Sequence, residues 1–122
     1  MPKYLIQGSY SAEGLKGLLE EGGGSRRAAV AQLVQNLGGT LEVFYYTFGE
    51  DDTLVIADLP DNVTATAISI AANASGAVKV KITVLLTPEE IDEATKKTTF
   101  YRAPGQSVQG NFAQTDRKNL EE

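Results

Sequence analysis

Hydrophobic positions along the chain follow the period of a strand in some runs and the period of a helix in others. The strand-like runs, rich in Val, Ile, Thr, Phe and Tyr, are residues 3–10, 40–48, 53–59 and 78–86. The helix-like runs, whose apolar side chains recur every three or four positions, are residues 11–21, 25–37, 60–76 and 87–97. The order β-α-β-β-α-β with a terminal helix predicts an α+β protein with the ferredoxin-like fold, an antiparallel sheet with helices on one face.

Glycines and capping residues mark where the predicted helices begin and end. Three glycines at residues 22–24 break the first helical region, and Ser25 is typical of the N-cap of its second piece. Residues 87–90, with the sequence Thr-Pro-Glu-Glu, form the pattern of a capping box and predict a short helix. The helix over residues 60–76 is expected to turn one apolar stripe to the sheet. The residues of that stripe are Val63, Ala67, Ile70, Ala71 and Ala74.

The central hairpin indicates that both faces of the sheet are covered. In the last strand, apolar residues alternate with Lys79, Lys81 and Thr83, as in a sheet with one face in water. The hairpin breaks this rule because its aromatic residues fall on both faces; they are Phe44, Tyr45, Tyr46 and Phe48. Since helices of the same chain can cover only one face, an identical subunit is expected to cover the other. The protein is therefore expected to be a homo-oligomer, at least a dimer.

The composition limits the domain organisation and the chemistry. A chain of 122 residues is long enough for one core of its own. Residues 1–98 are expected to form the ferredoxin-like domain, and residues 99–122, which lack periodicity, an extended or disordered tail. The chain has 0 Cys and 0 His, which excludes disulfides, cysteine nucleophiles, zinc sites with these ligands and histidine acid–base catalysis. No cofactor and no metal site is expected.

Charge and hydropathy limit the partners. The formal net charge of −5 does not suit a phosphate-backbone partner, so no nucleic acid is expected. No apolar run has the length of a membrane span, so no membrane partner is expected. The first residues lack the charged and apolar regions of a signal peptide, and a cytoplasmic location is therefore expected.

One candidate anion site follows the glycine break. Gly24, Ser25, Arg26 and Arg27 combine free backbone N–H groups at a predicted helix N-terminus with two guanidinium groups, a combination that suits a small anion. The sequence does not match a phosphate-binding loop, because no Gly-Lys-Ser or Gly-Lys-Thr follows the glycines. The alternative is a glycine hinge between two helical pieces, with both arginines in water.

A second candidate site lies on the strands. By strand alternation, Gln7, Ser9, Lys79 and Lys81 could converge with Tyr46 inside a dimer and form a polar pocket for a small molecule. A lysine buried there could also act as a base. The alternative is a set of ion pairs across the dimer, with carboxylates such as Glu42 and Asp58 as partners.

Consecutive carboxylates occur in the loop of the hairpin. Glu50, Asp51 and Asp52 could take a hard cation, but they lack the spacing of a calcium loop, and acidic residues are common in turns. The turn interpretation is preferred, and no metal ligand is assigned.

Several segments of the chain together resemble one known family. These are residues 2–6, 22–27, 48–52, 55–61, 73–78 and 85–90. On these residues the chain resembles the GYD-domain family of small, mostly uncharacterised bacterial and archaeal proteins. The resemblance implies the dimeric α/β-barrel form of the ferredoxin-like fold and a bacterial or archaeal source, but no established activity. Gly49 and Asp52 match the ends of the family's Gly-Tyr-Asp, and Asp51 stands where a tyrosine is expected.

Two functions of different classes remain open from the sequence. The first is an oligomeric module that is structural or binds a small anion or metabolite. The second is a cofactor-independent enzyme, similar to a monooxygenase or an isomerase, with its pocket at the barrel interface. The lack of a matched acid–base pair favours the first.

Overall fold

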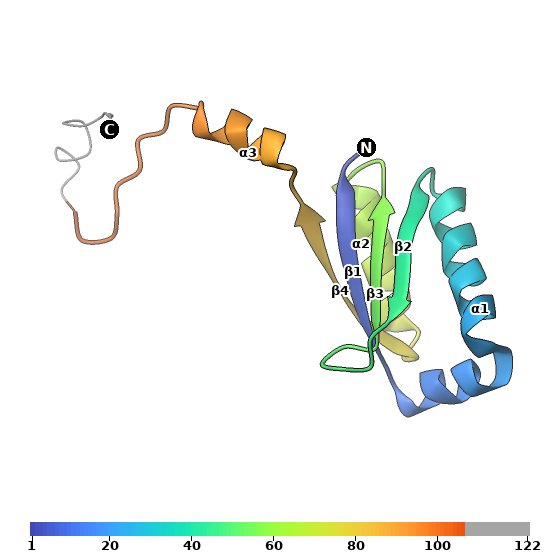
Figure 1. The fold of residues 1–122 in the computed structure, drawn as a ribbon. Helices are drawn as coiled ribbons and strands as arrows, with labels where there is room; N and C mark the ends of the chain where they lie inside the picture. The colour runs from blue at the N-terminus through green and yellow to red at the C-terminus, as the bar shows by residue number, and fades with distance from the viewer. Residues whose placement is uncertain (107–122) are drawn as a thin grey trace. The chain divides into compact units, whose positions relative to one another are not determined.

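A computed structural model describes residues 1–106 of the chain and confirms the predicted α+β fold (Figure 1). The elements in chain order are β1 (Lys3–Tyr10), α1 (Ala12–Asn36), β2 (Thr40–Tyr46), β3 (Thr53–Asp58), α2 (Asn62–Ala74), β4 (Val78–Leu85) and α3 (Pro88–Thr95). The four strands form one antiparallel sheet in the order β2-β3-β1-β4, which is the ferredoxin-like arrangement.

The described residues fall into two compact units. The first, residues 1–86, holds the sheet with α1 and α2, and the second begins at Thr87 and contains α3. The capping box predicted for α3 is present, since Thr87 accepts from the backbone of Glu90 and Glu90 accepts in return. Residues 98–106 contain no helix or strand. The rest of the predicted tail, residues 107–122, lies outside the described residues.

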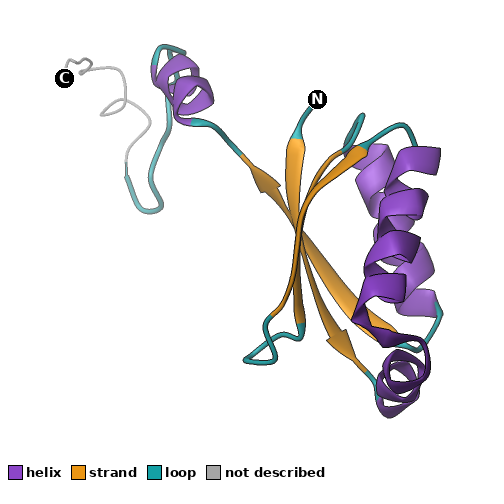
Figure 2. Cartoon of the chain, turned by 45° about the vertical axis from the view of Figure 1, so that its right-hand side comes forward, coloured by secondary structure: helices purple, strands orange, loops and turns teal. Residues whose placement is uncertain are grey.

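Both α1 and α2 pack on one face of the sheet, and the core lies between them and the strands (Figure 2). Its buried members are Tyr4, Ile6, Val34, Val55, Ala57, Leu59, Ala65 and Ile68. The second face of the sheet carries the alternate residues of each strand and is covered by neither α1 nor α2. We refer to it as the open face.

The prediction of which side of α2 is buried is wrong. Ala65 and Ile68 face the core, whereas Val63 and Ile70 are 77% and 65% exposed. The physical reason is that α2 carries no charged residue, so that apolar side chains occur on more than one of its sides and periodicity alone does not select the buried one. Asp61 caps this helix, and the hydrogen bonds it accepts from the backbone and the hydroxyl of Thr64 hold the pKa of its carboxyl below its usual value.

The break in α1 lies at one glycine rather than three. Gly22 has φ 83° and ψ 164°, a conformation open almost only to glycine, while residues 23–25 continue as helix. Ser25 is therefore inside the second half of α1 and is not its N-cap, which corrects the sequence prediction. A hydrogen bond holds the break to the sheet, because the Tyr46 hydroxyl donates to the carbonyl oxygen of Gly23 at 3.0 Å.

Candidate functional site

Four of the five predicted pocket residues, Gln7, Ser9, Lys79 and Lys81, share the open face. Gln7 lies directly opposite Lys81 in the β1–β4 pairing, and Lys79 lies two residues before Lys81 on the same strand. Gln7 also lies opposite Leu54, which in turn lies opposite Tyr45. One row of side chains, Tyr45, Leu54, Gln7 and Lys81, therefore crosses the whole sheet on its open face.

Tyr46 does not join this row, and its predicted place beside the lysines is wrong. Its partner across the hairpin is Thr53, which is buried beneath the helices, and its hydroxyl reaches Gly23 in α1. The extra residue at a β-bulge between Leu41 and Val43 sets which side chains of β2 face the helices. Tyr45 is thus the tyrosine of the open face, where it is 67% exposed.

An apolar band occupies the middle of the open face. It consists of Leu5, Val43, Tyr45, Leu54, Ile56 and Leu85. At one end of the band, the Lys3 ammonium donates to Glu42 and to Asp58 at 3.0 Å each, and these bonds raise the pKa of Lys3. Within one chain, Glu42 and Asp58 are thus the partners of Lys3.

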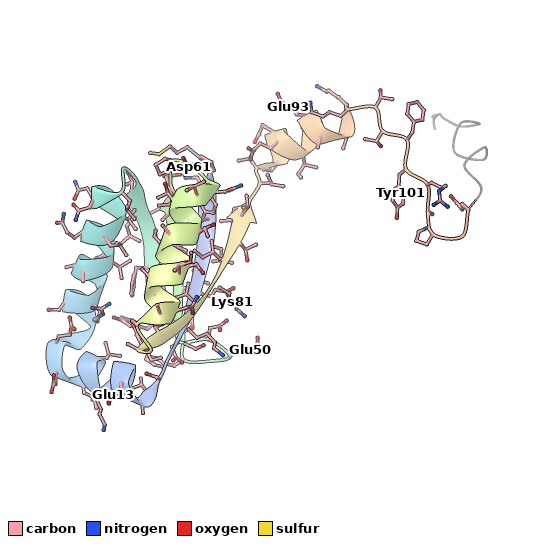
Figure 3. The ribbon with its side chains drawn as sticks, turned by 180° about the vertical axis from the view of Figure 1, so that it is seen from behind. Glu13, Glu50, Asp61, Lys81, Glu93 and Tyr101 are labelled. Atoms are coloured by element: carbon pink, nitrogen blue, oxygen red, sulfur yellow. The ribbon has the colours of Figure 1, made fainter. Side chains whose placement is uncertain are left out.

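At the other end of the band, the β2–β3 loop meets β1 and β4 (Figure 3). The Asp51 carboxylate accepts from the Ser9 hydroxyl at 3.2 Å and lies 3.4 Å from the Lys81 ammonium. Within residues 1–106, Lys79 forms no ion pair and the Gln7 side chain no hydrogen bond. Lys79 and Gln7 are therefore available to contact another molecule.

The acidic loop serves the fold. Asp52 accepts the backbone N–H of Tyr10 at 2.7 Å, and Asp51 is engaged as described above. Among the residues that the structure describes, no group of carboxylates is arranged to hold a metal ion. These contacts favour the turn interpretation of the loop over a cation site.

The four residues of the predicted anion site do not share one environment. Arg26 is half-buried and lies 3.7 Å from Glu21, while Gly24, Ser25 and Arg27 are exposed on the second half of α1. Ser25 lies three residues beyond the break at Gly22 and is not an N-cap, so the helix start predicted at this serine is not present. Of the four residues, Arg26 lines a cavity.

That cavity is a cleft between α1 and α2, which the sequence did not predict. It has a volume of about 440 Å³. Its apolar lining includes Leu18, Leu33, Ile68, Ala72 and Val78, and its polar lining includes Tyr10, Glu13, Glu21, Arg26 and Ser75. Gly14 and Gly17, three residues apart on α1, both line the cleft, and this pair of helix glycines was the signal available in the sequence.

Comparisons with known proteins identify the family of the chain. No curated protein is similar enough to this chain to be matched with it. In the described part of the chain, no helix is both long and apolar enough to cross a membrane. The family model of the GYD domain matches residues 4–95, which include the three helices and all four strands except Lys3 of β1. The chain therefore belongs to the GYD domain family, whose function is unknown.

Proposed function

We propose that this GYD domain is a homo-oligomeric binding module, at least a dimer, in which a second copy covers the open face of the sheet. The observation that carries the proposal is the apolar band, whose six side chains are turned away from both α1 and α2. A contiguous apolar patch rimmed by polar groups is typical of a protein interface.

The charges around the band suit a symmetric contact. Glu42 and Asp58 lie at the end of the band near Lys3, while Lys79 and Lys81 lie on the edge strand β4. In a two-fold interface the same surface is used by both copies, so one copy's lysines can lie near the other's carboxylates. The subunits would close into the α/β barrel expected from the family resemblance.

The polar groups on the open face support binding of a small anion between the subunits. Lys79 and Gln7 lack partners within residues 1–106, and an ammonium enclosed by a second copy requires a counter-charge. Lys81 forms an ion pair with Asp51, and this contact suits a structural role better than the role of a catalytic base. This arrangement favours a binding module over an enzyme.

Sedimentation of matched leucine variants tests the self-association. Leu54→Glu introduces a carboxylate into the apolar band, whereas Leu19→Glu makes the same change at a position on α1 that is 86% exposed. At low micromolar concentration, the unaltered chain and Leu19→Glu should sediment as dimers or larger species and Leu54→Glu as a folded monomer. Circular dichroism verifies that each variant is folded. A monomeric unaltered chain, or a dimeric Leu54→Glu, contradicts the proposal.

A phosphate titration tests the anion site. Phosphate should shift the backbone amide resonances of residues around Lys79 and Gln7, and Lys79→Met should remove these shifts without changing the sedimentation. Lys16→Met, an exposed lysine on α1, is the control and should leave the shifts in place. Phosphate shifts that survive in Lys79→Met would show that this lysine does not hold the anion.

A further inference from the structure

We infer that the cleft between α1 and α2 is a second binding site, for a small carboxylic acid with an apolar body. The cleft lies on the helix side of the sheet and is separate from the open face. The inference is independent of self-association, since every lining residue belongs to one copy and to one compact unit.

The size and the walls of the cleft suit a small molecule. Its volume of about 440 Å³ lies within the usual range for ligand pockets. Leu18 and Leu33 from α1 face Ile68 and Ala72 from α2, and Val78 of β4 completes the apolar lining. Such walls attract an apolar body, while a few polar groups at the rim decide which ligand is accepted.

Gly17 keeps the cleft open. In a helix interior, glycine is less favourable than alanine, so its presence calls for a reason. At Gly14 the reason is packing, because a Cβ would clash with the carbonyl oxygen of Ala77. At Gly17 a Cβ would meet nothing within 4 Å in the described chain. Packing therefore does not require glycine at position 17, and its missing side chain leaves space in the cleft for a ligand.

Arg26 supplies the charge that selects the ligand. Its guanidinium carries five N–H donors, and its one ionic contact in residues 1–106 is with Glu21, at a distance too long for a hydrogen bond. A carboxylate fits the fork of a guanidinium with two parallel hydrogen bonds. Glu13 and Glu21 also line the cleft and repel a dianion more strongly than a monoanion. A monocarboxylate is therefore favoured over a phosphate dianion.

Hexanoate is a suitable probe, and hexan-1-ol is its neutral counterpart. In a titration followed by amide resonances, hexanoate should shift residues of the first half of α1, the middle of α2 and the start of β4. Arg26→Gln should weaken the binding about tenfold or more, as expected for a lost charge-assisted pair. Arg27→Gln, at the exposed neighbouring position, should leave it unchanged. Hexan-1-ol should bind as weakly as hexanoate binds to Arg26→Gln.

A pair of glycine variants isolates the cavity. Gly17→Leu fills the cleft and raises helix propensity, so the variant should fold and lose the hexanoate shifts. Gly24→Leu makes the same change on the second half of α1, at a position outside the cleft with equally free space, and should keep them. Performing both titrations in the Leu54→Glu background separates this site from self-association. The inference is overturned if hexanoate causes no shifts, if the shifts map to the open face, or if Gly17→Leu binds as tightly as Gly24→Leu.

Discussion

Tyr46 connects the sheet to the break in α1 through both its hydroxyl and its ring. The hydroxyl donates to the Gly23 carbonyl, and the ring lies 3.1 Å from where a Cβ of residue 23 would stand. On its own strand the ring packs edge-on to Phe44, with ring centroids 5.1 Å apart, and it stacks on Phe48 at 5.9 Å. A Cβ at position 23 would push this ring away by a few tenths of an ångström, so packing favours glycine there, and backbone conformation favours it at position 22.

The environment of Tyr46 predicts that its phenol titrates at a higher pH than an exposed tyrosine. Burial raises the pKa of its phenol above the ordinary value, the charge of Tyr10 raises it further, and the Arg26 guanidinium opposes both. The folded-state pKa is raised, so the neutral Tyr46 phenol contributes to the stability of the folded state. This contribution is complete below the unfolded-state pKa near 10 and is lost as the pH rises through the folded-state pKa. The tyrosinate absorbance of the unaltered chain minus that of Tyr46→Phe should therefore have a midpoint above 10. A midpoint at or below 10 would contradict this assignment.

At the scale of elements, α2 is distinguished by apolar residues on both its inner and outer sides. Ile68 is 6% exposed and packs in the core, whereas Ile70 is 65% exposed two residues later. Ile68→Ala should lower the free energy of unfolding by about 2–5 kcal/mol, because it leaves a cavity. Ile70→Ala removes the same atoms from the surface and should change it by at most about 0.5 kcal/mol. Urea unfolding of the two variants checks the orientation of α2, and equal losses would contradict it.

The elements that could be predicted from the sequence are those fixed by local interactions. Ser11, at the first turn of α1, and Thr87 cap their helices as expected, because each hydrogen bond spans three residues. The face occupied by Tyr46 depends on pairing with Thr53 across the hairpin, and the buried side of α2 depends on its packing against β4. The cleft depends on how far α1 lies from α2 after the turn at Gly22. None of these long-range relations is encoded in a short sequence pattern.

At the scale of the whole molecule, the sheet separates two surfaces with different chemistry. The helix side holds the core and the cleft with Arg26, whereas the open face holds the apolar band between two charged ends. Ligand binding and self-association would therefore occur on opposite sides of one sheet. A small molecule in the cleft would not have to compete with a second copy for the same side chains.

Self-association predicts that stability depends on protein concentration. If folding and dimerisation are coupled, association stabilises the native state by mass action, and a tenfold change in concentration corresponds to about 1.4 kcal/mol. For two chains of 122 residues unfolding together, this corresponds to about 3–5 °C in Tm for each tenfold change. Leu54→Glu, as a monomer, should have a Tm that does not change with concentration, while Leu19→Glu should follow the unaltered chain. Thermal unfolding recorded over a wide range of concentrations decides the matter, and a constant Tm for the unaltered chain would show that its subunits fold without one another.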